Sequence, residues 1–201
     1  MEIRVYAEGG GDSKDNKAFL REGLSAFLQE LVSIARTKKI RWQVVTCGCR
    51  RATFDAFRTA VDQWPDAFCV LLVDAEGSVQ TAPWLHLQQR DGWQCGALSD
   101  EHCHLMTQAM EAWFIADLEA LSRFYGADFH QNRIPRNPDV EQIEKNQLEP
   151  ALRDASRDTQ KGEYHKTKHA WKLLKVIDPQ HVRHASRHCE RLFRVLTAKM
   201  E

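Results

Sequence analysis

Acidic residues follow three predicted strands of this 201-residue chain. Glu8 ends the run EIRVYAE, Asp74 and Glu76 follow the apolar run CVLLV, and Glu111 follows EHCHLMTQ. Carboxylates placed close together repel one another, which raises their pKa values unless a cation neutralises them. Mg²⁺ prefers oxygen ligands of this kind. The spacing therefore predicts a site for Mg²⁺ or Mn²⁺ built from Glu8, Asp74 and Glu76, with Asp12 and Glu111 as additional acids.

The same residues also have a simpler interpretation, in which each acid merely ends a strand at a turn, because Asp and Gly favour turns. Recurrence at three strand ends favours the metal site over this alternative. The stretch EGGGD matches neither G-x4-G-K-[ST] nor G-x-G-x-x-G, so a nucleotide-binding loop is not indicated. Its glycines either bring the backbone close to a bound metal or phosphate, or form a flexible turn.

A basic segment lies towards the end of the chain, around the run YHKTK. We expect Lys166 to touch a phosphate, with His165 and Lys168 beside it. Tyr164 and Trp171 are interleaved with these cations, a pattern that suits nucleic-acid binding by phosphate pairing and stacking. The alternative is a solvated helix face whose tryptophan points inward.

These side chains need a scaffold that brings strand ends together. Hydrophobic periodicity predicts strands over 2–8, 41–48, 67–73 and 101–108, and helices over 15–39, 50–64, part of 81–100, and 109–126. Strands joined by helices lie parallel, and open parallel sheets bind ligands at the carboxyl ends of their strands. We therefore expect an α/β fold, a mostly parallel sheet flanked by helices, with its metal-binding core in residues 1–126.

Residues 127–201 complete the expected domain. The stretch 127–149 is polar and contains Pro135 and Pro138, which predicts a surface excursion. Two helices are predicted around 166–177 and 186–200, joined by DPQHVRHA, as a C-terminal helical extension packed on the same domain.

Composition excludes several classes of protein. Lys plus Arg and Asp plus Glu both count 28, so no global positive field draws the chain to nucleic acid. We see neither a secretory signal nor an apolar run long enough to cross a bilayer, and we expect a cytoplasmic protein with no membrane contact. The six cysteines are expected to be reduced, because Cys69 lies inside an apolar strand run and no secretory signal is present. C-x-C at 47–49 and HCH at 102–104 lack the spacing of a structural zinc site.

The motifs VYAEGGGD, LLVDAEG, QAMEAWFIAD and YHKTKHA resemble the small bacterial Toprim-like proteins of the DUF4276 family. Toprim is a Rossmann-like, metal-binding α/β fold found in topoisomerases, primases and OLD-type nucleases. The resemblance covers nearly the whole chain. By position, it implies metal binding by Glu8, Asp74 and Glu76, additional OLD-type acids at Asp12 and Glu111, and phosphate contact by Lys166.

The activity implied is Mg²⁺-dependent phosphodiester hydrolysis, as a DNA or RNA nuclease whose catalytic residues are Glu8, Asp74, Glu76 and Lys166. The resemblance also implies an ATPase partner and a setting in phage defence. One departure is that the Toprim pair is usually D-x-D, whereas this chain has Asp74-Ala75-Glu76. Two alternatives stay open: a non-catalytic interaction or regulatory subunit of an ATPase complex, and a small phosphatase or nucleotidyl hydrolase.

Overall fold

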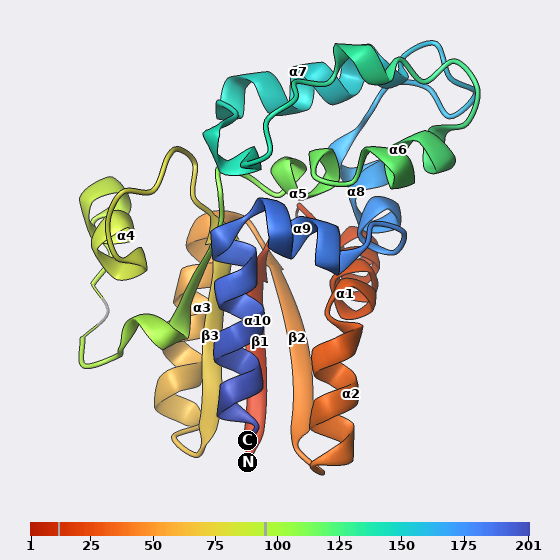
Figure 1. Ribbon diagram of the computed structural model, residues 1–201. Coiled ribbons are helices and arrows are strands. Elements are labelled where there is room, and N and C mark those ends of the chain that lie inside the picture. The colour runs from red at the N-terminus through yellow and green to blue at the C-terminus, as the bar shows by residue number, and fades with distance from the viewer. Residues whose placement is uncertain (12, 95) are drawn as a thin grey trace.

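The computed structural model describes residues 1–11, 13–94 and 96–201, and a sheet of four parallel strands forms its centre (Figure 1). From edge to edge the strands are β2 (Arg41–Gly48), β1 (Glu2–Glu8), β3 (Ala67–Asp74) and β4 (Cys103–Met106). All four strands were predicted, and the predicted parallel α/β fold is confirmed. The order places β1 beside β3, so their carboxyl ends are neighbours.

The central strands are buried on both faces, because helices cover each side of the sheet. Alternate residues point to opposite faces: Val5 and Leu72 belong to one apolar cluster, while Leu71 and Val73 belong to the other. The first cluster contains residues of α1 (Lys14–Phe27), α2 (Gln29–Thr37) and α10 (Arg187–Lys199), and the second contains residues of α3 (Arg50–Gln63) and α4 (Pro83–Asp91). This arrangement is consistent with a Rossmann-like or Toprim-like fold.

Two helices predicted as continuous are divided in the structure. The segment 15–39 forms α1 and α2, separated at Leu28. The segment 109–126 forms α5 (Glu111–Ile115) and α6 (Leu118–Tyr125). Asp117 lies between these two helices, and its carboxylate accepts hydrogen bonds from the N–H groups of Ala120 at 3.0 Å and Asp178 at 2.8 Å. A side chain that caps one helix and holds a distant loop explains this division.

The stretch 127–149, expected to be a surface excursion, contributes residues to the core. Ile134, Val140 and Ile143 are buried in the same apolar cluster as Val5. The remaining elements are the short 3-10 helices η1 (Asp100–His102), η2 (Gln131–Arg133) and η3 (Val140–Gln142), and the helices α7 (Lys145–Ser156), α8 (Lys166–Leu174) and α9 (Pro179–Ala185). Figure 1 shows α5, α7 and α9 lying beyond the carboxyl ends of the strands. No helix in the described ranges has the length and apolarity needed to cross a membrane.

The position of α8 depends on a close approach to α1. A Cβ atom at Gly23 of α1 would lie 2.6 Å from the carbonyl oxygen of Trp171 in α8, a separation that real Cβ atoms do not adopt. Glycine therefore lets the backbones of the two helices meet. Since α8 begins at Lys166, this contact also fixes the position of the Lys166 backbone.

Candidate metal centre

Three predicted acids meet at the carboxyl ends of β1 and β3. Glu8 is the last residue of β1, and Asp74 is the last residue of the neighbouring strand β3. Glu76 follows two residues later, and its N–H donates a 2.7 Å hydrogen bond to the carbonyl of Gln108. One carboxylate oxygen from each acid lies within 4.8 Å of the others. The predicted convergence of Glu8, Asp74 and Glu76 is thus present in the structure.

The glycine run after β1 folds tightly against the end of β2. Gly9 and Gly48 have φ angles of 119° and 94°, which L side chains rarely adopt, and the Gly9 N–H bonds to the Gly48 carbonyl at 2.8 Å. A Cβ at Gly48 would lie 2.6 Å from the Gly11 carbonyl oxygen. Close contact between two chain segments thus accounts for these glycines. Asp12, predicted as an additional acid, lies outside the described residues.

Glu111 and Lys166 join the cluster from two helices. Nζ of Lys166 lies 3.5 Å from Oδ2 of Asp74 and 3.6 Å from Oε1 of Glu111. The side chains of both acids are almost fully buried, whereas that of Lys166 is 44% exposed. The cation therefore bridges two acids and still faces solvent. Oδ1 of Asp74 accepts a further 2.8 Å hydrogen bond, from the N–H of Met110.

Tyr164 has a different role from the one its sequence context suggested. It is 1% exposed, so it cannot stack on a nucleobase. Its hydroxyl donates a 2.9 Å hydrogen bond to Oε1 of Glu111. Lys168 and His165 are exposed around the start of α8, with the His165 ring bonded to Thr167, and they stand outside the contacts that join Lys166 to the acids.

Arg50, the first residue of α3, is a site residue that the sequence did not reveal. Nη1 lies 3.2 Å from Oε2 of Glu8 and also donates to the carbonyl of Asp74. The same guanidinium is anchored by Asp91, at 2.7 Å and 3.1 Å. An arginine at the start of a helix carries no local signal for such a role, because the partners come from β1, β3 and α4.

The acids at the strand ends resist ionisation in the absence of a cation. Burial, and then the charge of Asp74, raise the pKa of Glu8 to about 7, against the opposing effect of Arg50. Burial likewise raises the pKa of Asp74, with a contribution from Glu111, although Lys166 acts to lower it. Burial would lower the pKa of Lys166, but the charges of Asp74 and Glu111 raise it overall. The cluster therefore favours an additional positive charge.

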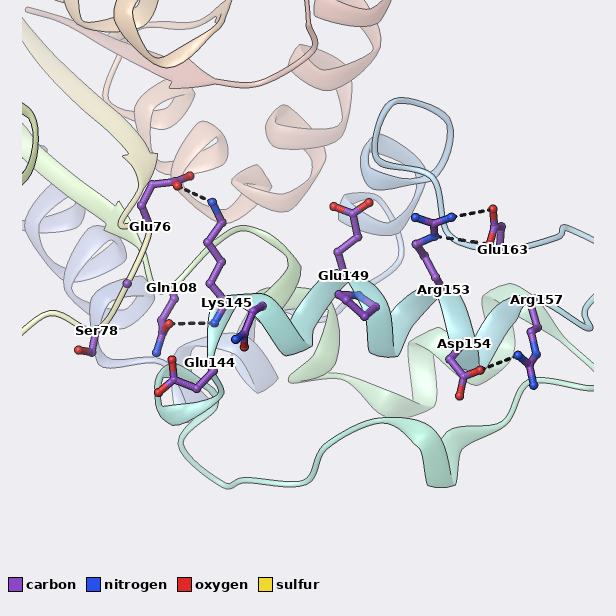
Figure 2. A pocket seen from close by; sticks show the side chains of 13 residues that line it. Glu76, Ser78, Gln108, Glu144, Lys145, Glu149, Arg153, Asp154, Arg157 and Glu163 are labelled. Atoms are coloured by element: carbon purple, nitrogen blue, oxygen red, sulfur yellow. Dashed lines mark hydrogen bonds and ion pairs between the residues drawn. The ribbon is translucent and has the colours of Figure 1, made fainter.

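Glu76 is held differently from the other two acids. Burial alone would raise its pKa, but its hydrogen bond to Lys145 and the charges of Lys145 and Arg90 lower it overall. Arg90 lies 3.2 Å from Oε2 of Glu76, the oxygen that also accepts from Lys145. Lys145 stands at the edge of a pocket of about 980 Å³ that runs along α7 (Figure 2).

The donor set suits a hard divalent cation. Glu8, Asp74 and Glu76 offer only oxygen atoms, which select Mg²⁺ and Mn²⁺ over softer metals. Burial is the largest cause of the raised pKa values of Glu8 and Asp74, and the nearby charges of Arg50 and Lys166 do not offset it. An ion at this point would relieve their mutual repulsion, so the residues present fit the predicted metal.

Comparison with known proteins is consistent with the motifs. Neither a curated protein nor a solved structure matches the chain. A family model does match, described as a domain of unknown function (DUF4276), over residues 7–197. That span contains both strand ends and the first residue of α8, and the match confirms the resemblance to this family. The chain belongs to the DUF4276 family.

Proposed function

We propose that the protein is a divalent-metal-dependent phosphodiester hydrolase, a nuclease that cuts DNA or RNA. The observation that supports this most strongly is the convergence of three carboxylates within 4.8 Å at the ends of adjacent strands. The raised pKa values of Glu8 and Asp74 add a physical reason for a cation to bind there.

Glu8, Asp74 and Glu76 would hold Mg²⁺ or Mn²⁺. When bound, such an ion acts as a Lewis acid on a phosphate oxygen and lowers the pKa of coordinated water. Hydrolysis of a phosphodiester forms one bond between the water oxygen and phosphorus. It breaks one bond between phosphorus and the leaving oxygen, which takes up a proton.

Lys166 is suited to bind the reacting phosphate. Its half-exposed ammonium lies beside Asp74 and Glu111, and the charges of these acids keep it protonated. A lysine ammonium is a point charge that pairs readily with phosphate oxygens. Glu111, fixed by Tyr164, positions this cation at the same edge of the sheet as the acids.

The direct test is cleavage of supercoiled plasmid and single-stranded RNA in Mg²⁺, Mn²⁺ or EDTA. Asp74→Asn should abolish cutting, because the amide loses the negative charge. The amide oxygen can still accept the Met110 N–H, so the variant should fold, and matching melting temperatures would check this. Equal cleavage by variant and parent would refute the assignment.

One observation favours a second candidate, a non-catalytic interaction or regulatory subunit. Glu76 already carries two ion pairs, from Lys145 and Arg90, so one acid of the three is neutralised by the chain itself. A protein of this kind should show no saturable Mn²⁺ binding that depends on Asp74.

The resemblance to OLD-type proteins implies, for both candidate functions, an ATPase partner in phage defence. Co-purification of an ATPase with the tagged protein from its natural host would test that partnership.

A further inference from the structure

Glu76 is the most accessible of the three clustered acids, and of these three it alone has a positive φ angle. Its side chain is 21% exposed, against 16% for Glu8 and 5% for Asp74. Its φ of 69° is in the left-handed region, which is unfavourable for a glutamate and is often found at functional sites. The backbone N–H of Glu76 bonds to the Gln108 carbonyl, and the carboxylate pairs with Lys145 and Arg90.

The two cations that hold Glu76 differ in how firmly they are anchored. Arg90 also pairs with Asp91, which in turn binds Arg50. Within the described residues, Lys145 has no acid other than Glu76 within ion-pairing distance. Lys145 is therefore the cation that can leave Glu76 without breaking a second ion pair.

The side chain of Lys145 has space for a second position of its ammonium. The backbone N–H of Lys145 is fixed by a 2.9 Å hydrogen bond to Oε1 of Gln108. Its side chain is 40% exposed, at the edge of the pocket that runs along α7, the α7 pocket (Figure 2). Glu149 and Arg153 project from the same side of α7 along this pocket. A lysine has a flexible four-carbon stem with a strongly hydrated charge at its end, so the ammonium can turn into the pocket while the helix stays in place.

We propose that Lys145 exchanges partners during the reaction cycle, releasing Glu76 to the divalent cation and pairing with a phosphate of the nucleic-acid substrate in the α7 pocket. This inference rests on the proposed nuclease function. In the free protein the ammonium and a metal ion compete for the same carboxylate. Because substrate removes the competitor, metal and substrate strengthen each other's binding, and the coupling is reciprocal.

The exchange makes two opposite predictions for Lys145→Met in the full-length protein. Calorimetric titration with Mn²⁺, without substrate, should show tighter binding by about tenfold, within the usual range of coupling between sites. Cleavage measured as kcat/KM at saturating Mn²⁺ should fall, because a phosphate contact is lost. If Lys145 had only a structural role, Lys145→Met would weaken both Mn²⁺ binding and cleavage, or leave both unchanged.

Two further variants make the test specific. Arg153→Met removes a cation from the same helix and pocket, but Arg153 pairs with Glu163, so Mn²⁺ affinity should not change. In a Glu76→Gln background, Lys145→Met should no longer tighten Mn²⁺ binding, because the shared carboxylate is gone. Lys145→Arg keeps the charge and should leave Mn²⁺ affinity close to that of the parent.

The outcomes separate this inference from the proposed function. Mn²⁺ binding that is unchanged or weaker in Lys145→Met overturns the exchange, whereas cleavage that depends on Asp74 still supports the nuclease. Tighter Mn²⁺ binding together with unchanged kcat/KM overturns the phosphate contact. A parent protein that binds no Mn²⁺ overturns both the exchange and the nuclease.

Discussion

The backbone N–H of Asp74 donates a 3.2 Å hydrogen bond to Oε2 of Glu8. The end of β3 therefore holds the side chain at the end of β1, and the guanidinium of Arg50 supports the same oxygen. Burial and the charge of Asp74 outweigh these contacts and raise the pKa of Glu8 to about 7. Contacts with β3 and Arg50 thus hold the Glu8 carboxylate in place. Its ionisation is nevertheless unfavourable when no cation is bound.

Glu8→Gln should stabilise the metal-free protein above neutral pH. With an ordinary pKa of 4.5 and a folded pKa of about 7, Glu8 binds more protons in the folded state between these values. Its contribution to stability is full below the ordinary pKa and is lost as pH rises through the folded pKa. Since glutamine does not ionise, the melting temperature of the variant relative to the parent should rise between about pH 5 and about pH 8 in EDTA.

The matched control for this experiment is Glu119→Gln, whose side chain is 80% exposed. It should give the same melting temperature as the parent at both pH values. A Glu8→Gln difference that does not change with pH would contradict the raised pKa.

Divalent ions should stabilise the folded protein through Asp74. A ligand that binds only the folded state adds about 2.7 kcal/mol when its concentration is about 100 times its Kd. Melting curves in Mg²⁺, Mn²⁺ and EDTA should therefore show a higher melting temperature with metal for the parent and no such rise for Asp74→Asn. An equal rise in both proteins would place the metal elsewhere.

Arg50→Met should weaken both stability and metal binding. The substitution leaves Asp91, Oε2 of Glu8 and the Asp74 carbonyl without their common donor, which should cost roughly 1–3 kcal/mol of unfolding free energy. Loss of a group that orients a metal ligand typically lowers metal affinity by about 10- to 100-fold. Urea denaturation and Mn²⁺ titration would measure the two effects.

The neighbouring Arg51 provides a close control for Arg50. Its side chain is 71% exposed and pairs with Asp55 one helical turn away, a contact worth less than about 0.5 kcal/mol. Arg51→Met should leave Mn²⁺ affinity unchanged. If both variants behaved alike, the contacts of Arg50 would have no special importance for the site.

The scaffold could be predicted because its signals are local. The apolar run before Asp74 and the alternation before Glu8 mark buried strands, and the rule for parallel sheets brings their ends together. By contrast, α7 contains Pro150, and proline removes a helical hydrogen bond, so the pattern around it did not indicate a helix. Its first residue, Lys145, was missed for that reason.

Contacts between distant segments had no local signal at all. Glu111 precedes α6 in the sequence and Tyr164 follows α7, so the hydrogen bond between them joins two distant segments of the chain. It depends on how α8 packs on α1, where Gly23 lets the helix backbones meet. A tyrosine in a basic run is typical of a nucleic-acid contact, and only the structure shows that Tyr164 is buried and that its hydroxyl bonds to Glu111.

Tyr164→Phe should reduce cleavage without reducing metal affinity. The change removes the 2.9 Å hydrogen bond to Oε1 of Glu111, which leaves a buried carboxylate with one donor fewer and should cost roughly 1–3 kcal/mol. The ring and its packing are retained, so the fold should persist. Because Glu111 also lies beside Nζ of Lys166, the cation loses part of its support and kcat should fall. Tyr164 contacts none of Glu8, Asp74 and Glu76 through a described hydrogen bond, so Mn²⁺ affinity should stay the same.

A double-mutant cycle with Glu111→Gln distinguishes this positioning role from simple loss of stability. If Tyr164 acts through Glu111, the two substitutions together should lower kcat by less than the product of their separate effects. Independent, multiplicative effects on kcat would show that the hydroxyl acts elsewhere. A loss of unfolding free energy with kcat unchanged would make Tyr164 a core residue that only happens to lie beside the site.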